Sequence, residues 1–163
     1  NTLEISEAIN LKTKISSSEL RVSLESRNLR NVRVALGRFY SLRGRVIKGK
    51  GLGRKIGFPT ANIVIMEDKM LPGSGVYFIE ALIGTGKFKG MCNIGFNPTI
   101  SSSNKLSIEV HLFNLDENLY NKEIVINFID FIRREKKFKD VKSLKEQLVA
   151  DKNKCLEYSL YNV

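Results

Sequence analysis

The sequence of 163 residues has no tryptophan, one histidine (His111) and two cysteines (Cys92 and Cys155). A structural zinc site usually needs four Cys or His ligands, and because the chain has only three such residues, a structural zinc site is excluded. The two cysteines lie far apart, which makes a disulfide framework improbable and favours a reduced, cytoplasmic setting. These three residues also form no recognisable nucleophile–base pair. No apolar run approaches the roughly 20 residues of a membrane-spanning helix, so we expect no membrane partner.

Negative charge is also scarce: 17 Asp and Glu stand against 27 Lys and Arg, for a net charge of +10. A balance this basic favours an anionic partner, such as a nucleotide phosphate, a nucleic acid or an acidic membrane surface. Charge alone does not choose among these three. The chain begins at Asn1 rather than Met, within a polar segment, so we expect a fragment of a longer protein.

Two regions with different hydrophobic periods meet near residue 40. Before it, Ser16 and Glu19 have the spacing of a capping box at a helix start. A second short helix is predicted to open at Asn31 and to end at Gly37. This stretch has too few apolar residues to fold alone, so we expect a short helical appendage at residues 1–39 and the main domain at residues 40–163.

From residue 40 the apolar period becomes two, which predicts strands separated by turn-forming residues. Six strands without intervening helices favour a closed antiparallel barrel, because closure removes exposed edges. Near the end, Ser143 and Glu146 predict a further helix start, and Cys155 falls on the apolar face of that helix. The predicted strands are Ser41–Ile47, Asn62–Met66, Val76–Ile83, Phe88–Ile94, Leu106–Phe113 and Ile124–Ile132.

The stretch from Gly49 to Asn62 carries four glycines in its first nine residues, with Lys50, Arg54 and Lys55 among them. Glycine amides and nearby cations can surround phosphate oxygens. The pattern is not a Walker A loop, because no Gly-Lys-Ser/Thr and no helix follow. A flexible basic hairpin explains the glycines equally well.

Thr60 and Asn62 follow this stretch and share a strand face at period two. A hydroxyl and an amide carbonyl beside a phosphate suit Mg²⁺, which takes few protein oxygens and keeps several waters. The alternative is that the two residues only start a strand and satisfy a turn.

Glu109 stands out in the strand that follows, because its neighbours Ile108 and Val110 are apolar. Its carboxylate lies either on the solvent face, which is the usual case, or in a functional cleft where it can act as a base. His111 shares its face and is equally well explained as a structural hydrogen-bonding residue.

Taken together, these segments resemble the riboflavin kinase family, in particular the kinase module of the prokaryotic bifunctional riboflavin kinase/FAD synthetase. The resemblance covers about residues 40–151 and keeps both order and spacing. Asn121 stands where the family usually has Gly, and Asn tolerates a left-handed turn better than most residues. The matching residues are Gly57-Phe58-Pro59-Thr60-Ala61-Asn62, Gly75-Val76-Tyr77, Asn93-Ile94-Gly95 with Pro98-Thr99, Glu109-Val110-His111, Leu119-Tyr120, Ile132-Arg133 with Glu135 and Phe138, and Asp151.

The resemblance implies a mainly β fold, a six-stranded antiparallel barrel with a C-terminal helix, that transfers the γ-phosphoryl group of ATP to the 5′-hydroxyl of riboflavin, giving ADP and FMN. Glu109 would be the catalytic base, and Thr60 and Asn62 would hold Mg²⁺. The flavin would contact Arg133, Glu135 and Phe138. Carried over by position, the ATP-binding residues would be Gly49, Gly51, Gly53, Lys55, Gly57, Pro59, Thr60 and Asn62.

Residues 15–21 resemble the end of the family's adenylyltransferase module, so residues 1–39 would be the remnant of that module and its linker. The module's His-x-Gly-His motif is missing, and we expect no FAD synthesis by this chain alone. Two other interpretations remain. A small basic barrel could bind single-stranded nucleic acid through Lys50, Arg54, Lys55 and residues 133–138, although aromatic residues are few. A catalytically silent flavin-binding domain is disfavoured by the intact Pro-Thr-Ala-Asn sequence and Glu109.

Overall fold

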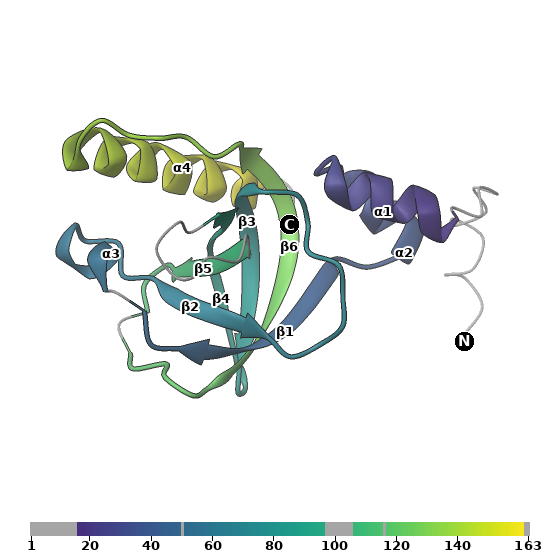
Figure 1. Ribbon diagram of the computed structural model, residues 1–163, viewed down its shortest axis with the longest axis horizontal. Coiled ribbons are helices and arrows are strands. Elements are labelled where there is room, and N and C mark those ends of the chain that lie inside the picture. The colour runs from purple at the N-terminus through teal and green to yellow at the C-terminus, as the bar shows by residue number, and fades with distance from the viewer. Residues whose placement is uncertain (1–15, 50, 97–105, 116, 162–163) are drawn as a thin grey trace.

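A computed structural model describes residues 16–49, 51–96, 106–115 and 117–161 and contains a closed six-stranded barrel (Figure 1). The strand order around the barrel is β1-β2-β5-β4-β3-β6, and every neighbouring pair is antiparallel. All six predicted strands and the barrel are therefore confirmed. The strands are β1 (Tyr40–Ile47), β2 (Ala61–Ile65), β3 (Gly75–Ile83), β4 (Gly86–Phe96), β5 (Leu106–Leu112) and β6 (Glu123–Arg133).

The alternating pattern of each strand separates the inside of the barrel from its outside. In β5, Ile108, Val110 and Leu112 are buried in the apolar interior. Glu109 and His111 have the opposite parity, so their side chains leave the outer surface of the wall. Apolar residues therefore form the core inside the barrel, and the polar side chains of β5 face its outside.

Two N-terminal helices, α1 (Ser17–Glu25) and α2 (Leu29–Leu36), pack on the barrel core through Leu24, Leu29 and Val32. Ser16 and Glu19 form the predicted capping box. The α2 helix begins two residues before the predicted start at Asn31, because the Asn28 side chain accepts a hydrogen bond from the Asn31 backbone and so caps it. Gly37 ends α2 in a left-handed conformation, as predicted.

The C-terminal helix α4 (Val141–Tyr161) covers part of the outer wall, and its last turns lie beside β6 (Figure 1). Phe78, Met91 and Phe113 from the wall and the buried Cys155 of α4 belong to a second apolar cluster outside the barrel. No helix within the described residues is long and apolar enough to cross a membrane.

The predicted capping box of Ser143 and Glu146 is wrong, because α4 begins earlier, at Val141. The Asp140 carboxylate accepts hydrogen bonds from both the backbone N–H and the hydroxyl of Ser143, at 2.7 Å each. These hydrogen bonds hold the pKa of Asp140 below its usual value. A carboxylate one turn upstream thus takes the role that the sequence pattern gave to Ser143.

Candidate active site

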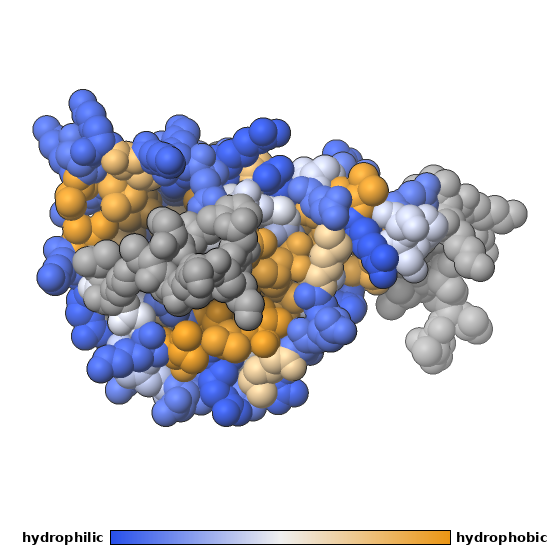
Figure 2. All heavy atoms as spheres, viewed as in Figure 1, coloured by the Kyte–Doolittle hydropathy of each residue, from blue (hydrophilic) through white to orange (hydrophobic). Residues whose placement is uncertain are grey.

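A cavity of about 700 Å³ lies outside the barrel, between the wall and α4. Figure 2 shows apolar side chains gathered between α3 (Leu52–Lys55) and α4, while hydrophilic side chains cover the outward side of α4. The wall contributes polar and apolar side chains, whereas α4 contributes apolar ones. Lining residues from the wall include Met91, Asn93, Glu109 and His111; those from α4 are Val141, Leu144 and Leu148.

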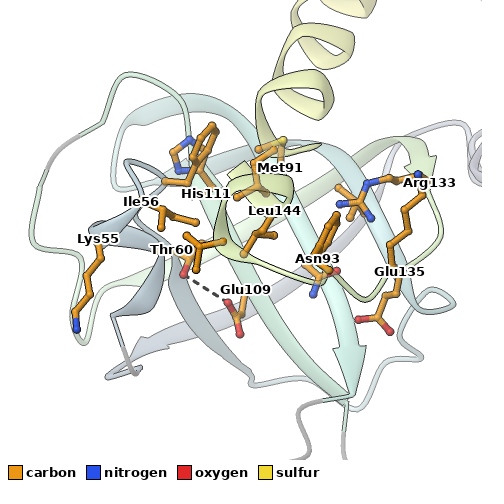
Figure 3. A pocket seen from close by; sticks show the side chains of 17 residues that line it. Lys55, Ile56, Thr60, Met91, Asn93, Glu109, His111, Arg133, Glu135 and Leu144 are labelled. Atoms are coloured by element: carbon orange, nitrogen blue, oxygen red, sulfur yellow. Dashed lines mark hydrogen bonds between the residues drawn. The ribbon is translucent and has the colours of Figure 1, made fainter. Parts of the chain in front are cut away.

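Glu109 projects into this cavity from β5 (Figure 3). In the sheet it pairs with Asn62 of β2 on one side and Asn93 of β4 on the other. The Thr60 hydroxyl donates a long hydrogen bond of 3.5 Å to Oε2 of Glu109. Of the two locations considered for this carboxylate, the structure therefore shows the cleft.

The glycine-rich stretch folds into a compact turn around α3, a single helical turn that the sequence did not predict. The element that follows the stretch is strand β2, as expected, and not a helix. The Phe58 backbone N–H donates to the Gly53 carbonyl at 2.9 Å. A Cβ at Gly53 would collide with the Phe58 carbonyl, so only glycine fits there. Gly53 and Lys55 line the cavity, while Lys50 lies outside the described residues.

A second, smaller cavity of about 200 Å³ adjoins the first, and Thr60 lines both. Arg54, Pro59 and Tyr120 are among the other residues of the smaller cavity. The Thr60 hydroxyl, with Glu109 next to it, thus stands where two hollows meet. Asn121 beside this cavity has a left-handed backbone, which confirms that the turn tolerates Asn.

Four of the residues expected at the nucleotide site do not line either cavity: Gly49, Gly51, Gly57 and Asn62. The Asn62 side chain lies against Gly49, where a Cβ would collide with its amide. Because Asn62 is the strand partner of Glu109, it still lies one strand away from the carboxylate. The structure therefore brings Thr60 and Glu109 together directly and Asn62 beside them.

His111 anchors the segment that carries Thr60. Its Nδ1 lies 2.8 Å from the Pro59 carbonyl oxygen, and its ring packs against Phe58 and Phe113. Since a carbonyl only accepts, Nδ1 carries the proton and the neutral ring leaves Nε2 as an acceptor. Burial is the largest influence on the pKa of His111 and lowers it, despite the opposing hydrogen bond to Pro59. His111 therefore makes the structural hydrogen bond expected of it, and it also lines the larger cavity.

The residues expected at the flavin, Arg133, Glu135 and Phe138, also line the larger cavity, at the opposite end from Lys55 (Figure 3). Arg133 lies over the Phe138 ring at 5.8 Å. Glu135 lies against Gly95, where any side chain would collide with its carboxylate. These three residues therefore share one end of the cavity.

Sequence reasoning assigned no role to Asp151, which is 2% exposed and forms an ion pair with Arg133 at 2.8 Å. A signal was available. Leu144, Leu148, Asp151 and Cys155 follow the spacing of one helix face, and an acid within an apolar stripe calls for a buried cationic partner.

Two hard oxygen donors meet here, the Thr60 hydroxyl and the Glu109 carboxylate that it contacts, and the Asn62 amide lies one strand away, against Gly49. No group of three or more His, Cys, Asp or Glu in the described part of the chain could hold a metal ion. A donor set with a single carboxylate does not suit zinc, but it fits Mg²⁺, whose remaining ligands are commonly phosphates and waters.

The chain is similar to several known proteins. A bifunctional riboflavin kinase/FMN adenylyltransferase from Bacillus subtilis is 39% identical over 147 residues, which cover 89% of this chain and 46% of the relative. A solved structure described as a macrolide-efflux protein from Streptococcus pneumoniae is 33% identical, with a TM-score of 0.81, covering 88% of this chain and 47% of that one. Riboflavin kinase from Trypanosoma brucei shares the fold at 19% identity, with a TM-score of 0.55 over 77% of this chain and 82% of that one.

The chain thus spans about half the length of the bifunctional relatives that it matches. The riboflavin kinase family model matches residues 36–159, which include the whole barrel and most of α4. The chain belongs to the riboflavin kinase family.

Proposed function

We propose that this chain transfers the γ-phosphoryl group of ATP to the 5′-hydroxyl of riboflavin. The observation that carries the proposal is the Glu109 carboxylate beside the Thr60 hydroxyl, where the two cavities meet. The larger cavity has the size of a small-molecule site and one largely apolar wall, which suits a flavin ring system. The glycine turn with Gly53 and Lys55 in the larger cavity, together with the adjoining smaller cavity and its Arg54, suits the nucleotide phosphates.

In this mechanism Glu109 accepts the proton of the ribityl 5′-hydroxyl. The hydroxyl oxygen then forms its bond to the γ-phosphorus, the bond to the β–γ bridging oxygen breaks, and ADP leaves. Lys55 and the backbone N–H groups around α3 stabilise the phosphate charge. Thr60 and Asn62 would hold Mg²⁺, which supplies charge neutralisation between the phosphates when bound. Positioning accounts for most of the catalysis.

Nucleic-acid binding is the weaker alternative. It requires Arg133 to be available for phosphate, yet the Arg133 guanidinium is committed to buried Asp151. Phe138 is half-buried at the cavity rather than presented for base stacking. We therefore propose ATP and riboflavin as the partners, no nucleic acid, and a cytoplasmic location. Because the relatives are bifunctional, we also propose that the full-length protein carries an upstream adenylyltransferase domain.

Incubation of the chain with ATP, Mg²⁺ and riboflavin, followed by chromatographic separation of the flavins, tests the proposal. FMN should accumulate with stoichiometric ADP, and omission of Mg²⁺ should abolish it. Failure to form FMN from either oxidised or reduced riboflavin would refute the kinase assignment. Accumulation of FAD would contradict the expectation that this chain performs only the kinase step.

A further inference from the structure

We infer that Asp151 and Gln147, on one turn of α4, are positioning residues that hold the segment of residues 133–138 in its binding conformation. This segment, called the flavin loop below, carries Arg133, Glu135 and Phe138. The inference rests on the proposed function for the identity of the ligand. The contacts that Asp151 and Gln147 make with the flavin loop, together called the clamp below, are present in the structure whatever the ligand is.

Asp151 holds the start of the flavin loop. Both of its carboxylate oxygens lie 2.9 Å from Nε of Arg133, and Oδ2 lies 2.8 Å from Nη2. The remaining guanidinium nitrogen, Nη1, donates to the Arg134 carbonyl at 3.0 Å. Because only 2% of Asp151 is exposed, its carboxylate cannot be solvated where it lies and depends on the Arg133 guanidinium for its charge partner. The forked geometry fixes the guanidinium in both position and plane.

Gln147 extends the clamp to the middle of the loop. Its amide nitrogen donates to Oδ1 of Asp151 at 2.8 Å, and its amide oxygen accepts from Nζ of Lys136 at 3.2 Å. Residues 147 and 151 are neighbours on the helix surface because they are four apart. One turn of α4 therefore holds the loop at two points, Arg133 and Lys136, with Glu135 between them. Lys154 adds a hydrogen bond of 3.1 Å to the Ile132 carbonyl, just before the loop.

Such a clamp lowers the cost of ligand binding. A loop ordered in the free protein has already lost its conformational freedom, so riboflavin does not have to order it. Glu109 and Thr60 lie on or beside strands β5 and β2, which the clamp does not touch. Loss of the clamp should therefore weaken flavin binding and leave ATP binding and the chemical step unchanged.

The test compares Asp151→Asn and Gln147→Ala with Glu146→Gln, which removes an exposed carboxylate from the same helix. Because Gln147 is only half-buried, we expect Gln147→Ala to fold, so this variant tests the clamp even if Asp151→Asn fails to fold. Limited trypsin digestion with mass-spectrometric mapping reports loop order without reference to activity. Riboflavin titration by flavin fluorescence reports binding. The trypsin sites within and just after the loop are Arg133, Arg134, Lys136, Lys137 and Lys139.

In Gln147→Ala, cleavage at these sites should be about tenfold faster, and the riboflavin Kd and KM should rise by about tenfold, the cost of ordering a few side chains at binding. The kcat and the ATP KM should stay within about twofold of wild type, as expected when only uniform substrate binding is lost. Glu146→Gln should match wild type in every measurement.

If Gln147→Ala, and Asp151→Asn where it folds, were cleaved by trypsin at the wild-type rate, the clamp would be disproved. Faster cleavage with an unchanged riboflavin Kd would overturn its role in binding. A lower kcat with an unchanged KM would do the same, because it would place the effect on the chemical step. Failure of the wild-type chain to bind riboflavin at all would refute the proposed function instead, and the cleavage rates would still decide whether the clamp exists.

Discussion

Replacement of Glu109 by Gln tests the chemistry most directly, because the substitution keeps the size and polarity of the side chain and removes its basicity. General-base catalysis contributes about 10²- to 10⁴-fold to a rate. At 1.36 kcal/mol per tenfold, this range corresponds to about 2.7 to 5.4 kcal/mol of the activation barrier. We therefore expect the kcat of Glu109→Gln to be about 10²- to 10⁴-fold lower than that of the wild type.

The fold should tolerate this change. Glu109 is half-buried, and its hydrogen bond from Thr60, at 3.5 Å, is long and can be accepted equally by a Gln oxygen. We therefore expect the free energy of unfolding to change by less than about 1 kcal/mol. KM values for ATP and riboflavin should stay close to wild type, since the lost interaction develops in the transition state.

Glu80→Gln provides a matched control. Glu80 is also a half-buried strand glutamate that accepts a 3.5 Å hydrogen bond, from Asn127, but it lines neither cavity. Single-turnover FMN formation, followed by rapid quench, would compare both variants with wild type. A Glu109→Gln rate within about fivefold of wild type, well below the usual contribution of a general base, would remove Glu109 from the mechanism.

Two further predictions concern the neighbours of this carboxylate. Thr60→Ala and Asn62→Ala should each raise the Mg²⁺ and ATP concentrations needed for half-maximal rate, by about tenfold for a lost ligand contact; metal titrations that match wild type would contradict the assigned ligands. His111→Gln should reduce the melting temperature most above about pH 6.5, because a lowered pKa in the folded state means that His111 stabilises the fold when neutral and that this contribution is lost as the pH falls. Calorimetry from pH 7.5 to 5 would disprove the His111 prediction if the difference in melting temperature between His111→Gln and wild type stayed constant.

The barrel could be predicted from sequence because its wall separates two environments. In β5, the alternation of Ile108, Glu109 and Val110 records which side of the wall each residue faces, so local sequence carries the information. Local sequence also predicted the end of α2 at Gly37, because glycine readily adopts the left-handed conformation that ends many helices. The likeness to a known family then gave the residues of the candidate site, and the structure places most of them around one cavity.

What sequence could not give depends on contacts between distant segments. The single turn of α3 includes Gly53 and is too short to show a helical period, so tertiary contacts decide its conformation. The pairing of Arg133 with Asp151 joins residues 18 positions apart and requires knowing that α4 docks on the wall. Asn62 was expected to converge with Thr60, but it lies against Gly49 instead, because strand parity fixes a direction and not a rotamer.

The separation of the apolar residues into an interior cluster and an external one gives each cluster its own thiol. Cys92 is buried inside the barrel, and Cys155 is buried beneath α4. Burial raises the pKa of Cys155 to about 12 and raises that of Cys92 as well, so neither forms an appreciable amount of thiolate at neutral pH while its layer stays closed. Each sulfur atom can therefore act as an intrinsic reporter of one opening event, detachment of the terminal helix or rupture of the barrel, without any engineered label.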